Sequence, residues 1–104
     1  DWVIIKLANI GIVNDIVIQT HHFKGNYPAT FSLQGSLISK NYNVKKLINN
    51  SAKWKSLISN KKLKPHDNLK ISKLNVKSEK INYIKLNIFP DGGISRLRIF
   101  GKIT

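Results

Sequence analysis

Apolar and polar residues alternate along much of this sequence, and this alternation limits the folds that the chain can adopt. Ile84, Leu86 and Ile88 share one face of an extended segment, because successive side chains of a strand point to opposite faces. Phe31 and Leu33 share a face in the same way. Apolar residues at helical spacing are scarce elsewhere. The pattern therefore predicts a chain built mainly of half-buried β-strands.

Residues typical of turns and loops separate the predicted strands. Pro90-Asp91-Gly92-Gly93 is the strongest turn signal, because proline fixes φ and glycine permits positive φ. Asn9-Ile10-Gly11 predicts a second turn, and residues 21–28 and 61–68 predict loops. Residues 39–50 fit either a short helix or a surface insertion. Seven or eight short strands indicate one all-β sandwich domain, with strands expected at Val3–Leu7, Ile12–Thr20, Thr30–Ser36, Trp54–Ile58, Leu69–Val76, Tyr83–Phe89 and Ile94–Ile103.

Composition excludes several classes of protein. The 104 residues suffice for one domain, and the absence of cysteine excludes disulfides, cysteine-zinc sites and a cysteine nucleophile. No apolar run approaches the roughly 20 residues that span a bilayer, so no membrane partner is expected. The first residues lack a signal-peptide pattern. The chain also lacks methionine, so we expect a fragment or a processed product.

The net charge of +13 has two interpretations. Sixteen of the 18 basic residues are lysines, and Ile, Lys and Asn together account for 44 residues. Their codons can consist of A and T alone, so a biased genome would produce this composition without a partner. A functional basic surface is the alternative. Nucleic acid is not favoured as a partner, because the lysines are scattered rather than interleaved with aromatic residues.

Two polar clusters lie in predicted loops beside good strands, where a rigid sheet commonly displays binding groups. The first occupies residues 20–28 and the second residues 89–98. No phosphate-binding glycine loop, zinc-protease motif or serine nucleophile elbow is present. The five carboxylates form no close group in the sequence, so we expect no self-contained metal site.

These clusters carry a resemblance to a known family. The order and spacing of four motifs along nearly the whole chain resemble the allantoicase repeat. Trp54 and Leu57 also occupy positions where that repeat has Trp and Leu. The motifs are Asp1-Trp2-Val3-Ile4-Ile5-Lys6-Leu7, His22-Phe23-Lys24-Gly25-Asn26-Tyr27-Pro28, Phe89-Pro90-Asp91-Gly92-Gly93, and Arg96-Leu97-Arg98 followed by Gly101.

The resemblance implies an antiparallel jelly-roll β-sandwich of the galactose-binding, discoidin-like type. It implies an allantoicase-like hydrolase that converts allantoate and water to ureidoglycolate and urea in purine and allantoin degradation. Such proteins usually carry two repeats in a longer chain, so residues 1–104 would be a single repeat without the Asp-Gly-Trp-Glu-Thr-Arg-Arg type segment that precedes Asp1. A second repeat or subunit is the expected partner, and the expected location is intracellular, in the cytoplasm.

Three positions depart from the family's pattern. Gln19 stands where members usually have Asp, Tyr83 stands where His is common, and Lys85 stands where Arg is common. The last change removes the bidentate geometry of a guanidinium group. A non-catalytic ligand-binding or structural domain that has lost the active site is therefore the alternative function.

Allantoate carries one carboxylate and two ureido arms, which suggests roles for the cluster residues. Arg96 or Arg98 would bind the carboxylate, and Lys24 and Asn26 would hold a ureido oxygen. His22 and Asp91 are the expected catalytic pair, with His22 exchanging protons near neutral pH. A structural role stays open for each, since Asp91 can simply form its turn and Asn26 can supply positive φ. No metal site is assigned and the cofactor is unknown.

Overall fold

The computed structural model describes residues 1–20, 30–38, 43–64, 68–72, 79–89 and 94–104. Within these ranges the chain forms six strands and one short helix, so the predicted all-β class is confirmed. The elements in chain order are β1 (Trp2–Gln19), β2 (Thr30–Ser36), α1 (Val44–Ser51), β3 (Lys55–Lys62), β4 (Asn68–Ile71), β5 (Lys80–Phe89) and β6 (Arg96–Ile103).

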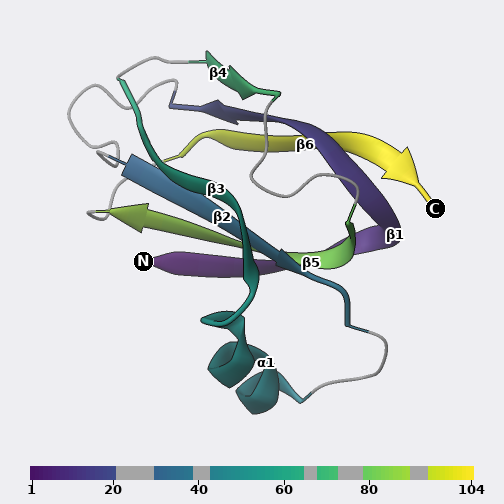
Figure 1. Ribbon diagram of the computed structural model, residues 1–104. Coiled ribbons are helices and arrows are strands. Elements are labelled where there is room, and N and C mark those ends of the chain that lie inside the picture. Colours follow the sequence, from purple (N-terminus) through teal and green to yellow (C-terminus); the bar gives the residue numbers. More distant parts are fainter. Residues whose placement is uncertain (21–29, 39–42, 65–67, 73–78, 90–93) are drawn as a thin grey trace.

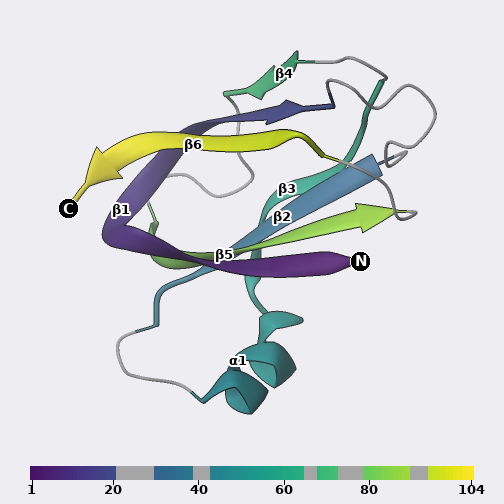
Figure 2. The ribbon, with the colours of Figure 1, turned by 180° about the vertical axis from the view of Figure 1, so that it is seen from behind.

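The long strand β1 connects two parts of one curled antiparallel sheet. Its first half pairs with β5, and the sheet continues from β5 to β2 and β3. Its second half lies between β4 and β6. Figure 1 shows β4, the second half of β1 and β6 above the remaining strands, and the view from behind in Figure 2 shows the same two groups.

The curl brings apolar faces from both groups together. Ile16 and Ile18 of β1 are fully buried, as are Phe31 and Leu33 of β2 and Ile84 of β5. All five belong to one hydrophobic cluster. The alternation in β2 and β5 thus predicts correctly which side chains face the core. Leu97 and Ile99 of β6 pack against the same cluster, as the alternation in residues 94–103 predicts.

The turn predicted at Asn9-Ile10-Gly11 is wrong, because β1 runs through these residues without ending. The chain instead shifts its register against β5 between Lys6 and Gly11. A Cβ atom at Gly11 would lie 2.5 Å from the carbonyl oxygen of Lys102. The glycine therefore serves the close approach of β1 and β6 rather than a reversal of the chain.

For residues 39–50 a short helix is one of the two expectations, and within the described residues 43–50 the chain forms the helix α1. Asn43 caps it, since the side-chain oxygen of Asn43 accepts a hydrogen bond of 2.9 Å from the backbone N–H of Lys46. The helix lies below the sheet in Figure 1, and Ser51 at its end reaches Lys85 of β5. The side chain of Gln34 on β2 donates to the carbonyl oxygens of Ala52 and Trp54, which follow the helix.

Candidate functional site

The two polar clusters are held together at both of their described ends. The backbone N–H of Ser95 donates to the carbonyl oxygen of Gln19 over 2.9 Å, and Gln19 pairs with Arg96 in the β1–β6 ladder. At the other ends, Thr30 pairs with Phe89 in the β2–β5 ladder. Residues 20–30 and 89–96 therefore begin and end beside one another.

Four of the predicted site residues fall between these ends. His22, Lys24 and Asn26 lie within residues 21–29, and Asp91 lies within residues 90–93, so all four are outside the described residues. Their assigned roles stay predictions.

Thr20 fixes the point at which the chain leaves β1. Its side chain is fully buried, and its hydroxyl donates to the carbonyl oxygen of Lys64 over 2.5 Å. This bond ties the end of β1 to the segment that follows β3. A buried hydroxyl needs a hydrogen-bond partner, and the carbonyl oxygen of Lys64 supplies one at the last described residue before the segment 21–29.

Arg96 and Arg98 lie on the exposed face of β6, as the alternation predicts, while Leu97 between them faces the core. In the β1–β6 ladder, Arg96 lies opposite Gln19 and Arg98 lies opposite Val17. Both guanidinium groups are therefore available to an anion on the outer surface, and Arg96 stands next to the ends of the two clusters.

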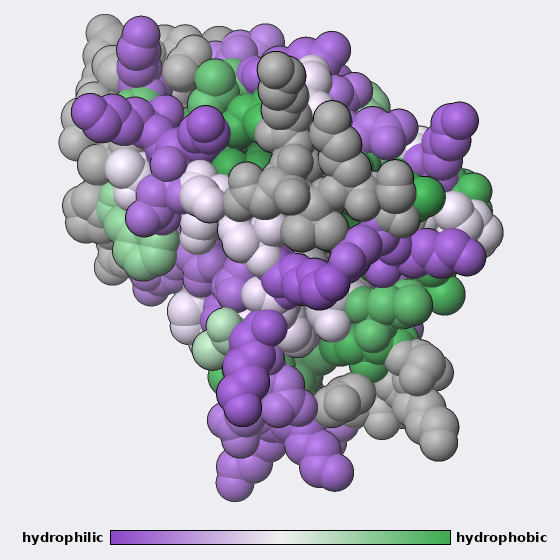
Figure 3. Space-filling model, in the orientation of Figure 1, coloured by the Kyte–Doolittle hydropathy of each residue, from purple (hydrophilic) through white to green (hydrophobic). Residues whose placement is uncertain are grey.

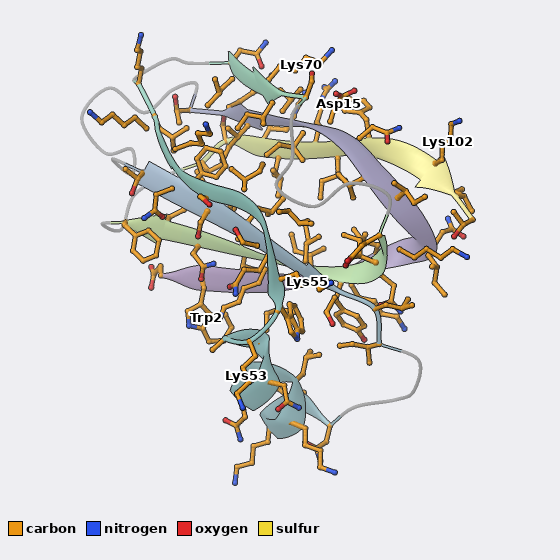
Figure 4. The ribbon with its side chains drawn as sticks, viewed as in Figure 1. Trp2, Asp15, Lys53, Lys55, Lys70 and Lys102 are labelled. Atoms are coloured by element: carbon orange, nitrogen blue, oxygen red, sulfur yellow. The ribbon has the colours of Figure 1, made fainter. Side chains whose placement is uncertain are left out.

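Strand β4 adds polar residues to the same surface. Asn68 lies opposite Gln19 and Lys70 lies opposite Val17, on the side of β1 away from β6. The amide nitrogen of Gln19 donates to the side-chain oxygen of Asn68 over 3.2 Å. Figure 4 shows Lys70 projecting outward from this part of the sheet. Two rows thus cross the three strands, Asn68–Gln19–Arg96 and Lys70–Val17–Arg98.

Sequence reasoning missed Asn68 and Lys70 as neighbours of the arginines. The alternation along each strand indicates which residues share a face of that strand, but not which strands are adjacent. The pairing of β4 with β1 spans about fifty residues of chain, since Gln19 pairs with Asn68, and no local signal reports it.

Tyr83 and Lys85, which depart from the family's pattern, contact the residues at the end of α1 and after it. Lys85 is only 8% exposed, and its ammonium group donates to the hydroxyl of Ser51 over 2.9 Å. The same group lies 4.9 Å from the centre of the Trp2 ring. The rings of Tyr83 and Trp54 are 6.2 Å apart. Figure 4 shows Trp2 near the end of α1 that leads into β3.

Exposed lysines occur on several elements rather than in one groove. Figure 3 shows hydrophilic side chains gathered around α1 at the bottom of the view. Lys55 forms an exposed ion pair with Glu79. In the ranges that the structure describes, no group of three His, Asp or Glu side chains could hold a metal ion. The described part of the chain also contains no helix long and apolar enough to cross a membrane.

The chain is similar over its whole length to proteins of one family. The family model described as the allantoicase repeat matches residues 1–104. The protein named probable allantoicase from Pseudomonas fluorescens strain Pf0-1 is 40% identical over 105 residues, which cover the whole chain and 31% of that protein. A probable allantoicase from Pseudomonas syringae pv. syringae strain B728a is also 40% identical, over 104 residues.

Solved structures agree with this match. The crystal structure of allantoicase from Saccharomyces cerevisiae superposes with a TM-score of 0.78 at 28% identity, covering 98% of this chain and 27% of that one. A second allantoicase structure superposes with a TM-score of 0.76. The chain spans about a third of the length of the curated relatives that it matches. From its motifs, its fold and these matches, the chain belongs to the allantoicase family, in which it corresponds to an allantoicase repeat.

Proposed function

We propose that this chain is one repeat of a hydrolase that converts allantoate and water to ureidoglycolate and urea, in allantoin and purine degradation. We also propose that the curled sheet is a jelly-roll β-sandwich of the discoidin-like type. The observation that carries the functional proposal is the pairing of the two polar clusters at both ends, Gln19 with Arg96 and Thr30 with Phe89. This pairing suits a shared site, because it keeps the two segments from separating.

The reaction requires groups that bind the carboxylate, groups that hold a ureido oxygen, and groups that transfer protons. The bond between the central carbon of allantoate and one ureido nitrogen breaks, the water oxygen bonds to that carbon, and the leaving nitrogen takes a proton. In our proposal, Arg96 or Arg98 binds the carboxylate, and Lys24 and Asn26 hold a ureido oxygen. His22 and Asp91 activate the water and supply the proton to the leaving urea.

A second repeat or subunit completes the site in this proposal. The chain covers 31% of the Pseudomonas fluorescens relative, so most of that polypeptide lies outside the matched region. Urea release from allantoate should therefore be measured with the chain alone and with a chimera, in which the chain replaces the matching segment of this relative.

Arginine variants of the chimera test the assignment. A charge-assisted hydrogen bond to a carboxylate contributes about 1.5–3 kcal/mol, so Arg96→Ala should lower kcat/KM by about 10- to 150-fold. Lys102→Ala is the matched control, because Lys102 is an exposed cation on the same strand that pairs with Ile12 instead of Gln19. Its turnover should match that of the parent chimera.

His22→Ala tests the proton-transfer role and should lower kcat by about 100-fold or more. Unchanged turnover in both the Arg96 and His22 variants would discard these assignments. A folded chimera that binds allantoate without releasing urea would instead identify a non-catalytic ligand-binding domain.

A further inference from the structure

An apolar groove opens between the first half of β1 and the start of β6. It has a volume of about 520 Å³, with Asp1 and Arg96 among its polar lining residues. Most of its lining is apolar and comes from β1, β5 and the residues around the start of β6, namely Val3, Ile5, Leu86, Ile88, Ile94 and Leu97.

The side chains of β1 in this groove face inward yet remain exposed. Val3 and Ile5 lie on the same face of β1 as Leu7, which packs against the core. They also pair with the buried residues Leu86 and Ile84. Even so, Val3 is 45% exposed and Ile5 is 37% exposed. The core is therefore open at this side in the part of the chain that the structure describes.

The same part of β1 also has a free backbone edge. Trp2 to Lys6 pair with β5 on one side, whereas β6 pairs with β1 only from Gly11 onward. Among the described residues, no strand lies on the other side of residues 2–8. Such edges are commonly blocked by proline or by several charges, but this segment has no proline and only one charge, on Lys6.

We propose that this groove is the docking site of an extended strand from another part of the longer family polypeptide. The strand pairs with the free edge of residues 2–8 and places alternate apolar side chains against Val3 and Ile5. The inference rests on family membership and not on the proposed reaction.

Length and charge favour this occupant over a second copy of the chain. The Pseudomonas fluorescens relative has more than two thirds of its length outside the matched region, so it has ample chain to supply a strand. A strand on the same polypeptide is also held at high effective concentration. A second copy would bring together two chains of net charge +13 each, which repel one another.

Hydrogen exchange of backbone amides tests the docking. Exchange is compared between the chain alone and the chimera that carries it within the Pseudomonas fluorescens relative. Alternate amides of residues 2–8 should exchange on the order of 100-fold more slowly in the chimera, because a docked strand protects them. Amides of β2 (Thr30–Ser36), which has strands on both sides, should exchange equally in the two proteins.

A substitution identifies the groove as the cause of the protection. Ile5→Lys in the chimera should restore fast exchange at residues 2–8, since a lysine cannot be buried under the docked strand without a partner. Val44→Lys is the control, because Val44 is 70% exposed on α1. It should leave the protection unchanged.

Equal exchange of residues 2–8 in both proteins, with β2 protected in both, would overturn the proposal. A chain that alone forms a dimer in sedimentation, with residues 2–8 protected in that dimer, would show a second copy as the occupant and overturn it too. Where the chimera does not fold, the unmodified relative gives the answer. In that relative, the backbone amides aligned with residues 2–8 should exchange as slowly as those aligned with β2. Fast exchange of the amides aligned with residues 2–8 would refute the docking.

Discussion

Replacing Ser51 with alanine removes the hydroxyl that accepts a hydrogen bond from the buried ammonium group of Lys85. The bond is 2.9 Å long, Ser51 is fully buried and Lys85 is 8% exposed. Loss of a hydrogen bond to a charged group costs about 1.5–3 kcal/mol. The hydroxyl also donates to the carbonyl oxygen of Ile48 over 2.7 Å, and a neutral bond contributes about 0.5–1.5 kcal/mol. We expect Ser51→Ala to lower the free energy of unfolding by about 2–4.5 kcal/mol in total.

A double-mutant cycle separates the two contributions. Lys85→Met keeps much of the side-chain volume and places a sulfur atom near the Trp2 ring, while it removes the charge. We expect this variant to lie within about 1 kcal/mol of the parent, because the cost of burying an ammonium group offsets its hydrogen bond and its contact with the ring. In the Lys85→Met background, Ser51→Ala should cost only the neutral bond, so the coupling energy should be about 1.5 kcal/mol or more.

Urea unfolding followed by tryptophan fluorescence measures these differences, since Trp54 is buried beside Tyr83 near α1. Equal costs of Ser51→Ala in the two backgrounds would refute the reasoning. That result would mean that the ammonium group of Lys85 gains nothing from the hydroxyl.

Three further changes test the fold by the same unfolding measurement. Phe31→Ala should destabilise the protein by about 3–5 kcal/mol, because the ring is fully buried in the core; a loss below about 1 kcal/mol would contradict this packing. Gly101→Ala should destabilise by about 1–3 kcal/mol, since the added Cβ would collide with the carbonyl oxygen of Ile12; unchanged stability would mean that β1 and β6 lie farther apart. Glu79→Gln should change stability by less than about 1 kcal/mol, because its ion pair with Lys55 is solvent-exposed; a larger loss would indicate a desolvated pair.

Local sequence patterns correctly predicted those strands in which the local pattern and the packing of the core favour the same structure. The alternation in β2 and β5 identifies Phe31, Leu33, Ile84 and Leu86 as core residues, and all four are buried. The same reasoning failed at Gly11, where a local turn signal gave way to a strand that continues beside β6. The alternation also gave no sign that Lys85 is buried, because that burial depends on Ser51 of α1, which accepts a hydrogen bond from it on the outer face of the sheet.

The candidate site was predictable only in part for the same reason. The motifs identify Arg96 and Arg98, and the strand period places both on one exposed face of β6. His22, Lys24, Asn26 and Asp91 stay predictions, because they lie outside the described residues. The neighbours that strand β4 provides could not be found from local patterns.

The all-β class, the inward and outward faces of the strands, and membership in the allantoicase family follow from the amino-acid sequence alone. These properties depend on side chains a few residues apart or on motifs that can be matched in order. Three features become visible only in the folded chain: β1 joins both parts of the sheet, Gln19 pairs with Arg96, and residues 2–8 keep a free edge among the described strands. Strand pairing is a contact between distant parts of the chain, and its register is selected by packing of the whole core.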